Sequence, residues 1–404
     1  MISISKKHLN TMVQKLKGSE YVKIGIITFQ LAWNCGAVLQ CYALQEYLQS
    51  LGHEAIVINY CPQYKEYRYK KYGNPFVNAI KELQTGGPKR ATKKFVRTIL
   101  NYRAGSEYLR QWNGFKVFCE KYLNLTRKYD SIEALRIDPP DCDLYISGSD
   151  QLWNPKLTNG QLDEVYFLNF GNENVRRITY AISACELNMD QYGCRLKELC
   201  HRLDAVSLRE VEGKEKLEIL IEREVSICPD PTFLANIEVF KRIIADKQKP
   251  NKDYIVVYAL EDSSGDSSQL FSQVGKLKER YQKEVLVITG PRNWPFPVTQ
   301  IRGICPEEFL YYINNAFCVV NNSFHATVFS ILFEKQFVTM GFRNRSARML
   351  ELLNNVGLQN RYYDNTKDII EIMEEKIEYC KIERKIEVLR DQGTSYLKAA
   401  ICSE

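Results

Sequence analysis

Apolar runs and helical patterns alternate along most of the chain. Residues 21–28 (YVKIGIIT) form a short apolar run rich in β-branched residues, which predicts a buried strand. A polar loop follows, then a helical pattern over residues 37–52, and then a second apolar run at residues 54–60. A strand, a loop, a helix and a strand in this order are typical of a βαβ unit with parallel strands.

The alternation is interrupted over residues 62–141, which are basic and aromatic and which we interpret as a mainly helical insertion. It resumes at residues 143–150 (DLYISGSD), a predicted strand that runs into a polar loop. The later predicted strands are RITYAIS, LDAVSLRE, VSICPDP, DYIVVYAL, EVLVITG, CVVNNS and QFVTMG, and helical patterns separate those of the second half.

Two successive α/β units predict two Rossmann-like domains that face each other across a cleft. We place the N-terminal domain at residues 20–235, including the insertion, and the C-terminal domain at residues 236–362. The charged tail, residues 363–404, is expected to form helices that pack back over the junction. In open parallel sheets of this kind, ligands bind outside the carboxyl ends of the strands.

The composition is that of a soluble globular protein. Of the 404 residues, 45% are hydrophobic and 26% are charged, which is enough to bury a large core. The formal net charge of +6 weakly favours anionic small molecules, lipid pyrophosphates or a membrane surface as partners, and we expect no nucleic acid. No apolar run is long enough to span a bilayer.

The thirteen cysteines are scattered without a CxxC pair. Residues 1–19 are polar and lack the apolar block of a secretory signal. We therefore expect a reducing compartment, the cytoplasm, with no disulfides and no structural zinc.

The segment VVNNSFHAT, residues 319–327, places a histidine at the start of a helix directly after an apolar strand. His325 is a candidate catalytic acid–base group. Asn322 and Ser323 are candidates for binding an anionic donor, because a helix N-terminus favours negative charge. The structural alternative is that Asn322 or Ser323 caps the helix and His325 packs on the sheet.

The segment ISGSDQLWNP, residues 146–155, also brings polar groups to the end of an apolar strand. Asp150 is the second catalytic candidate, and Trp153 offers a flat face that suits a sugar ring. The alternative is a local turn with a buried tryptophan. The candidate acceptor-binding residues in this segment are Gly148, Ser149, Gln151, Trp153 and Asn154.

The loop after the first strand ends in Asn34 and Gly36, two further candidates for binding the acceptor. This loop lacks the G-x-G-x-x-G fingerprint and the GK[ST] sequence of a P-loop, so we expect no nicotinamide, flavin or ATP cofactor. The alternative is that Asn34 is a plain helix cap.

Arg209 stands at the end of another predicted strand, where its planar guanidinium suits a carboxylate or a phosphate. The alternative is a surface arginine paired with Glu210 or Glu212. A second basic segment, GFRNRSAR, adds the candidate donor-binding residues Arg343, Arg345 and Arg348.

Taken together, these segments resemble the polysaccharide pyruvyl transferase family. They occur in the family's order and cover residues 23–361, nearly the whole chain apart from its ends. The motifs that carry the resemblance are NCGAVLQCYALQEYLQSLGHEAIVINY, SGSDQLWNP, YFLNF, ITYAIS, AVSLRE, CPDPTFL and NNSFHATVFSILFEKQFV.

The resemblance implies a fold similar to that of the GT-B glycosyltransferases, with the acceptor on the N-terminal domain and the active-site histidine on the C-terminal domain. It implies phosphoenolpyruvate as the donor and a pair of sugar hydroxyls as the acceptor. His325 matches the family's active-site histidine, and Arg209 matches the strand-end arginine assigned to the donor. Ser323 departs from the pattern, because better-studied members carry an arginine there; Arg343, Arg345 or Arg348 would then supply the anion contact.

We therefore expect a bacterial, cytoplasmic transferase that forms a cyclic 4,6-ketal on a hexose such as galactose. The acceptor would belong to a surface polysaccharide, capsule or exopolysaccharide, or to its lipid-linked oligosaccharide precursor. Phosphoenolpyruvate is a substrate, and no cofactor or metal is expected. Two alternatives are a GT-B-type glycosyltransferase that uses a nucleotide-sugar, and a non-catalytic capsule-assembly protein.

The basic stretch between residues 64 and 110 interleaves lysines and arginines with aromatic residues. It is a candidate for peripheral contact with the inner leaflet of the cytoplasmic membrane or with the pyrophosphate of a lipid-linked acceptor. The alternative is a solvated helical face.

Overall fold

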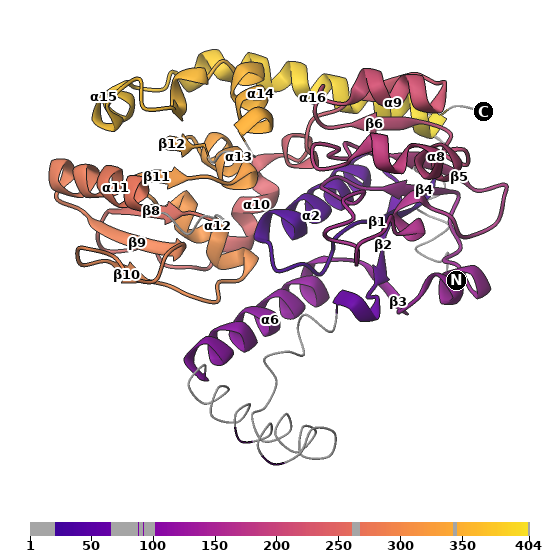
Figure 1. The fold of residues 1–404 in the computed structure, drawn as a ribbon, viewed down its shortest axis with the longest axis horizontal. Helices are drawn as coiled ribbons and strands as arrows, with labels where there is room; N and C mark the ends of the chain where they lie inside the picture. Colours follow the sequence, from indigo (N-terminus) through magenta and orange to yellow (C-terminus); the bar gives the residue numbers. More distant parts are fainter. Residues whose placement is uncertain are drawn as a thin grey trace, which may run out of the picture.

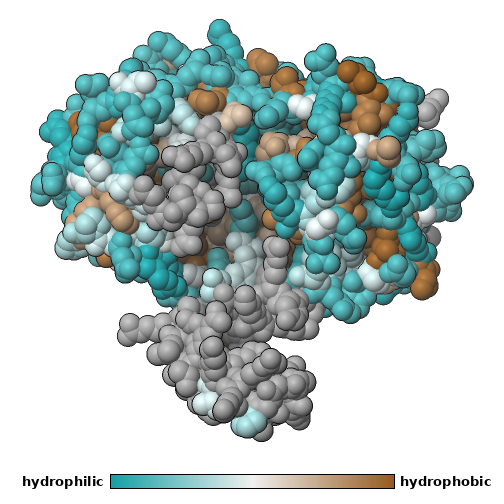
Figure 2. All heavy atoms as spheres, viewed as in Figure 1, coloured by the Kyte–Doolittle hydropathy of each residue, from teal (hydrophilic) through white to brown (hydrophobic). Residues whose placement is uncertain are grey.

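The computed structural model describes residues 21–65, 88, 92, 102–260, 267–341 and 346–402. Two parallel sheets form the centres of two halves of the molecule, with helices around them (Figure 1). Hydrophilic side chains cover most of the face seen in Figure 2, and hydrophobic ones appear there in small separate groups. The apolar runs of the sequence are thus used for the interior.

The first sheet has the strand order β3-β2-β1-β4-β5, with every pair parallel. Its central strands are almost fully buried, as expected where helices cover both faces of a parallel sheet. A small parallel pair, β6 and β7, extends this sheet through isolated bridges. The strands are β1 (Lys23–Ile27), β2 (Glu54–Tyr60), β3 (Leu125–Tyr129), β4 (Leu144–Ser147), β5 (Arg176–Thr179), β6 (Val206–Leu208) and β7 (Val225–Ile227).

The helices of the first half include the long α2 and α6, and α2 lies between the two sheets (Figure 1). There it packs against α12 of the second half and against η2, so the halves share one hydrophobic core. The helices are α2 (Cys35–Ser50), α6 (Tyr102–Tyr122), α7 (Ile132–Ile137), η1 (Glu164–Phe167), α8 (Met189–Cys200), α9 (Lys214–Ile221) and η2 (Pro231–Phe233).

The predicted insertion at residues 62–141 contains a strand that the sequence pattern did not reveal. Strand β3 pairs with β2 at the edge of the first sheet. Its sequence, LTRKY, is largely polar, and only its last residue is buried, so it has no apolar run to mark it. Helices α6 and α7 flank it, and most of the remaining insertion lies outside the described residues.

The second sheet has the order β10-β9-β8-β11-β12-β13, again with parallel pairs. Its strands are β8 (Tyr254–Tyr258), β9 (Glu284–Thr289), β10 (Thr299–Gln300), β11 (Cys318–Asn321), β12 (Gln336–Met340) and β13 (Tyr362–Tyr363). Its helices are α10 (Ile237–Ile244), α11 (Ser268–Tyr281), α12 (Pro306–Asn314), α13 (Phe324–Leu332), α14 (Ser346–Val356), η3 (Gln359–Arg361) and α15 (Ile369–Glu374).

In both sheets, the direction in which successive strands are added reverses at the middle of the sheet. In the first sheet the chain moves outward from β1 to β3 on one side and from β4 to β5 on the other. In the second sheet the same reversal separates β8 from β11. Such a switch point leaves a crevice at the carboxyl ends of the two central strands, which is where open α/β sheets bind ligands.

The last helix, α16 (Tyr379–Cys402), runs over both halves of the molecule (Figure 1). It contacts α14 of the second half, and on the first half the Tyr396 hydroxyl donates to the carbonyl of Thr179 at 2.8 Å. The Tyr47 hydroxyl of α2 also donates to Thr394 at 2.7 Å. The predicted return of the C-terminal helices over the junction is therefore confirmed.

No helix in the described part of the chain combines the length and the apolar character needed to cross a membrane.

Gly393 allows α16 to lie close to the first half, which generates a prediction. A Cβ atom there would clash with the hydroxyl of Tyr180 and would lie 2.8 Å from a methyl group of Leu234. We expect Gly393→Val to lower the free energy of unfolding by about 1–3 kcal/mol, because a tightly packed contact would be overfilled. Urea denaturation measures this loss. Ser395→Val, at an exposed position of the same helix, is the control, and equal losses in both variants would contradict the packing explanation.

Candidate functional site

One cavity lies where the carboxyl ends of both sheets meet, and its volume is about 490 Å³. The segments after β1 and β4 line it from the first half, and the segments after β8 and β11 line it from the second. Both switch points therefore open into the same space. The lining residues are Phe29, Ala32, Trp33, Asn34, Ala37, Lys65, Asp150, Gln151, Leu157, Arg209, Leu260, Ser323, Phe324, His325 and Arg348.

His325 lies in the first turn of α13 and reaches the cavity from the second half. Its Nε2 atom is 3.3 Å from a carboxylate oxygen of Asp230, and its side chain is 6% exposed. The first turn of α2 packs against the imidazole at Gly36, where any Cβ atom would overlap the ring. The imidazole is thus held between the two halves of the molecule.

Asp230 is fully buried and occupies the centre of a charged network. Its Oδ2 atom lies 3.0 Å from Nη1 of Arg209 and accepts a hydrogen bond from Ser149 at 3.2 Å. Burial alone would raise the pKa of Asp230. The charges and hydrogen bonds of His325 and Arg209, with a hydrogen bond from Thr232, outweigh burial and hold this pKa below its usual range.

Arg209 is buried and is paired with two carboxylates rather than one. Its Nε atom donates to Glu210 at 3.0 Å, and its guanidinium lies 4.2 Å from the ring centre of Phe324. Burial alone would lower the pKa of Arg209, but Glu210 and Asp230 outweigh burial and raise it. The pairing with Glu210 matches the structural alternative, although the arginine is not on the surface.

The oxygen that contacts both Arg209 and His325 belongs to the chain itself. The Asp230 carboxylate lies between these two side chains, with Oδ2 3.0 Å from Nη1 of Arg209 and 3.3 Å from Nε2 of His325. Within the described residues, no acceptor contacts Nη2 of Arg209, so this nitrogen remains for a ligand. Arg209 can therefore contribute at most part of its guanidinium to binding.

Ser323 and Asn34 cap helices and also line the cavity. Ser323 Oγ accepts from the backbone N–H of Ala326 at 3.5 Å at the start of α13. Asn34 Oδ1 accepts from the N–H groups of Gly36 and Ala37 at the start of α2, at 2.9 and 3.3 Å. The capping alternative holds for both residues, and the cavity still meets the N-terminal ends of two helices.

The prediction that Asn322 binds the donor is wrong. Its side-chain oxygen accepts from the N–H of Leu260 at 2.6 Å, and its side-chain nitrogen donates to the carbonyl of Leu260 at 2.8 Å. Both polar atoms therefore join the segments after β8 and β11, and Asn322 does not line the cavity. The capping alternative for Asn322 is also wrong, because Ser323 is the cap.

Asp150 and Gln151 line the cavity as predicted for a site beyond β4. Asp150 has a φ of +85°, which is uncommon for a residue with a side chain, and its carboxylate accepts from the N–H of Gln151 at 2.9 Å. The Gln151 amide points to the thiol of Cys185 at 3.4 Å.

The prediction that Trp153 offers a flat face to a sugar ring is wrong, because its side chain is fully buried. Its ring stacks on Phe167, with ring centres 4.6 Å apart and planes 9° from parallel. The Asn154 side chain closes a local turn by accepting from the N–H of Lys156 at 3.0 Å. After Gln151 the chain turns into the core, so the predicted acceptor contacts of Trp153 and Asn154 are not available.

Gly148 and Ser149 have structural roles and do not line the cavity. Ser149 is buried and donates to Asp230, as described above. Gly148 lies against Thr28, whose Cβ atom would be 3.2 Å from a Cβ at position 148. Gly36 likewise makes room for His325. Gly148, Ser149 and Gly36, which were predicted to bind the acceptor, thus contact other residues of the protein instead.

Arg348, in the first turn of α14, is the described member of the second basic segment, since Arg343 and Arg345 lie outside the described residues. Arg348 lines the cavity, and its Nη1 atom lies 3.9 Å from the sulfur of Cys185. Its Nε atom is buried without a partner among the described residues. No carboxylate of the described chain is within ion-pair distance of it, so its charge is available to a ligand.

Sequence reasoning missed several lining residues. Trp33 lies in the same loop as Asn34, and its ring packs against Tyr108 at 4.8 Å between ring centres. Phe29 and Lys65 line the cavity beside it. The sequence offered a signal for Trp33, because it is an aromatic residue next to the predicted site residue Asn34. For Lys65 the only signal was its position in a basic stretch.

A protein-family model described as polysaccharide pyruvyl transferase matches residues 34–344, which include every described residue of the charged network. No curated protein sequence gives a significant match. A candidate UDP-N-acetylglucosamine 2-epimerase from Listeria monocytogenes has a similar structure, with 9% identity, a TM-score of 0.51, and coverage of 94% of this chain and 96% of that one.

Two further solved structures are similar at lower TM-scores. One is MnaA with UDP from S. aureus, at 11% identity, with 92% of this chain and 90% of that chain covered and a TM-score of 0.48. The other is a spinosyn forosaminyltransferase, at 11% identity, with 95% and 100% covered and a TM-score of 0.42. The predicted α/β fold is confirmed by the two parallel sheets and by the likeness to the Listeria monocytogenes structure, which at 9% identity concerns the fold alone.

The contact between Gly36 and His325 generates a prediction. We expect Gly36→Ala to displace the imidazole from Asp230 and to lower the free energy of unfolding by about 1–3 kcal/mol, because the added methyl group overlaps the ring. A crystal structure and urea denaturation measure these effects. Gly193→Ala in α8 is the control. The added methyl group would lie 3.3 Å from its nearest neighbour, and replacing a glycine within a helix by alanine favours the helix. An unmoved imidazole in Gly36→Ala would contradict the prediction.

The lowered pKa of Asp230 generates a second prediction, for Asp230→Asn. A carboxylate with a lowered pKa stabilises the fold above the usual aspartate range and loses this contribution as the pH falls. The variant should lose about 1–3 kcal/mol near neutral pH, and its unfolding free energy should approach that of the parent as the pH falls below about 4.

Urea denaturation across this pH range measures both curves. Asp253→Asn removes an exposed carboxylate that pairs with Lys283, and it should change little at any pH. A constant difference between Asp230→Asn and the parent at all pH values would show that the charge of Asp230 is not the cause.

Proposed function

The chain belongs to the polysaccharide pyruvyl transferase family, and we propose that it moves a pyruvyl group from phosphoenolpyruvate to two hydroxyls of one sugar residue. The product would be a cyclic ketal, with phosphate released. The observation that carries the proposal is the cavity between the two sheets, where an imidazole backed by a buried carboxylate lies beside cationic side chains.

The reaction makes definite chemical demands. The methylene carbon of phosphoenolpyruvate gains a proton and becomes a methyl group, and the adjacent carbon becomes electrophilic. One sugar hydroxyl bonds to that carbon and loses its proton, which balances the proton gained by the methyl group. The carbon–oxygen bond to phosphate breaks, and the second hydroxyl bonds to the same carbon, closes the ring and gives its proton to the released phosphate. The site must therefore hold two anionic groups and move protons between carbon and oxygen.

His325 is the group that we propose for proton transfer. Its Nε2 atom lies 3.3 Å from the Asp230 carboxylate and Gly36 packs against its ring, so its position is set before a substrate arrives. The Asp230 carboxylate stabilises the positive charge that forms when the imidazole accepts a proton, as in other carboxylate–imidazole pairs. Asp150, on the opposite side of the cavity, is our proposed acceptor-hydroxyl base.

The anionic groups of the donor need cations or N–H donors. We propose Arg348, the free Nη2 atom of Arg209 and the N-terminal end of α13 at Ser323 for this purpose. Arg348 is supported by its unpartnered Nε atom, and Arg209 by its place beside His325. Arg343 and Arg345 precede α14 in the sequence and remain proposals from the sequence.

For the acceptor we propose Trp33 as the flat surface, with Asn34 and Gln151 as polar contacts, because all three line the cavity on the side of the first half. Aromatic rings present an apolar face that suits the C–H face of a sugar. A hexose such as galactose, with a 4,6-ketal product, is the acceptor that we propose. It would belong to a surface polysaccharide or its lipid-linked precursor at the inner face of the cytoplasmic membrane.

His325→Ala tests the proposed reaction. We expect phosphate release from phosphoenolpyruvate in the presence of galactose-containing acceptors to fall about a hundredfold to ten-thousandfold, because a positioned acid–base group is lost. Phosphate release and mass spectrometry of the acceptor measure the effect. His201→Ala removes an exposed histidine and should behave as the parent.

Full activity of His325→Ala would contradict the role of the imidazole. Transfer by the parent protein only from a nucleotide-sugar would overturn the proposed donor and would favour the glycosyltransferase alternative.

A further inference from the structure

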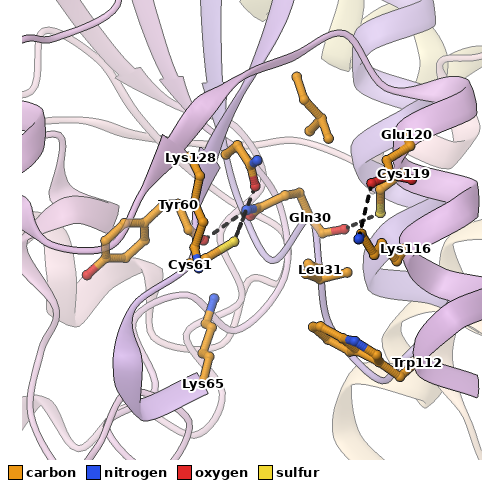
Figure 3. A pocket seen from close by; sticks show the side chains of 12 residues that line it. Gln30, Leu31, Tyr60, Cys61, Lys65, Trp112, Lys116, Cys119, Glu120 and Lys128 are labelled. Carbon is orange, nitrogen blue, oxygen red and sulfur yellow. Dashed lines mark hydrogen bonds and ion pairs between the residues drawn. The ribbon is translucent and has the colours of Figure 1, made fainter. Parts of the chain in front are cut away.

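A lysine outside the family-like motifs separates two cavities. Lys65 lines the large cavity described above and also a smaller one of about 300 Å³ between β2, β3 and α6. Figure 3 shows its side chain projecting toward Cys61 and Gln30, with Trp112 and Lys116 of α6 on the far side of the smaller cavity. Lys65 therefore forms a shared wall and can be reached by a ligand in the large cavity.

The surroundings of Lys65 are unusual for a charged side chain. Its Nζ atom lies 4.3 Å from the ring centre of Phe29 and 5.0 Å from that of Tyr166, and it donates a hydrogen bond to the Tyr166 hydroxyl. A lysine ammonium has three N–H donors, and one is used here. Among the described residues, no carboxylate lies within ion-pair distance of Nζ.

The nearest acidic group is occupied by other donors. Asp163 accepts hydrogen bonds from the hydroxyls of Tyr60 and Tyr64 at 2.9 and 2.7 Å, and from the N–H of Val165 at 3.0 Å. Burial lowers the pKa of Lys65 to about 7, and the charges of Asp163 and Cys61 only partly oppose this shift. Near neutral pH the amine is thus close to the balance between its neutral and charged forms.

The same cavity lacks one cation that the family pattern contains. Ser323 occupies the position of the expected arginine, and Arg209 is largely neutralised by Glu210 and Asp230. Arg348 from the second half is the other cation of the cavity without a carboxylate partner among the described residues. An anion placed between the halves would have Arg348 on one side and Lys65 on the other.

We propose that Lys65 is a donor-binding residue of this cavity and that it takes up a proton when phosphoenolpyruvate binds. The inference rests on the proposed function, because phosphoenolpyruvate is the donor in it. An anion beside Nζ favours the ammonium form, so binding and proton uptake are linked. The donor would thereby create the charge that holds it, and the empty cavity would avoid a half-buried, unpaired cation.

Other titratable groups face Lys65 from both sides. On its own side these are Cys61, Tyr60, Tyr64, Asp163 and Tyr166. Across the large cavity they are Asp150, Arg209, His325 and Arg348. Across the smaller cavity they are Lys116, Cys119, Glu120 and Lys128. Proton uptake at Lys65 is separated from proton uptake at these groups by substitution of Lys65.

Calorimetric titration with phosphoenolpyruvate, in buffers of different ionisation enthalpy, measures the number of protons taken up. At about pH 8, above the lowered pKa of Lys65, most of the amine is neutral, so the parent should take up protons at Lys65 when phosphoenolpyruvate binds. Lys65→Arg, which is always charged, should still bind phosphoenolpyruvate but without this uptake. Lys65→Met should bind it about tenfold to a hundredfold more weakly.

Lys116→Met is the matched control. Lys116 lines only the smaller cavity and is exposed beside Glu120, so this variant should bind phosphoenolpyruvate and take up protons as the parent does. An unchanged proton uptake in Lys65→Arg, or unchanged affinity in a folded Lys65→Met, would overturn the inference and leave the proposed function intact.

A labelling experiment tests the amine without the donor. Trinitrobenzenesulfonate reacts with neutral amines, so the rate at which it modifies Lys65 in the parent protein, followed by peptide mass spectrometry, should level off above about pH 8. A rate that keeps rising steeply between about pH 8 and pH 10 would show that the amine is still charged at pH 8 and would overturn the inference by itself. Failure of phosphoenolpyruvate to bind the parent protein would instead overturn both the proposed donor and this inference.

Discussion

The buried carboxylate of Asp230 is the constraint on which the site depends. A charge without access to water is costly unless hydrogen-bond donors and cations surround it, and here they come from distant parts of the chain. Ser149 follows β4, Arg209 follows β6, and His325 begins α13 of the other half. The second half adds His325 to this network, and the meeting of the two sheets at their carboxyl ends also encloses the cavity. Stability and the placement of the imidazole therefore have a common origin.

The strands of this fold could be predicted because parallel strands covered on both faces must be apolar throughout. Runs such as YIVVY of β8 and CVVN of β11 therefore stand out in the sequence. Strand β3 could not be found in this way, since it lies at a sheet edge and is mostly polar. The segments beyond the central strands were also correctly predicted to meet at one cavity, because strand direction alone determines where they emerge.

The roles of single residues within those segments were predictable only in part. A polar residue beyond a strand can face the cavity, cap a helix or close a turn, and these outcomes depend on contacts with residues far away in the sequence. Trp153 pairs with Phe167 in the core, and Asn322 joins two loops through the backbone of Leu260, although both have neighbours that line the cavity. Asp230 was part of a recognised motif, but its partners are 21, 81 and 95 residues or so away along the chain, and no local pattern shows them.

Helix α16 has a consequence for how the protein is made. Its tyrosine and glycine contacts with β5 and η2 complete the surface of the first half, yet it is translated after every strand of both sheets. Domains generally fold as they are synthesised, from the N-terminus onward. Here the first half must wait, with the surface around Tyr180 uncovered, until the second half and α16 have been translated. Folding of the two halves is thus coupled in time as well as in space, and a premature stop before residue 379 would leave both unfinished.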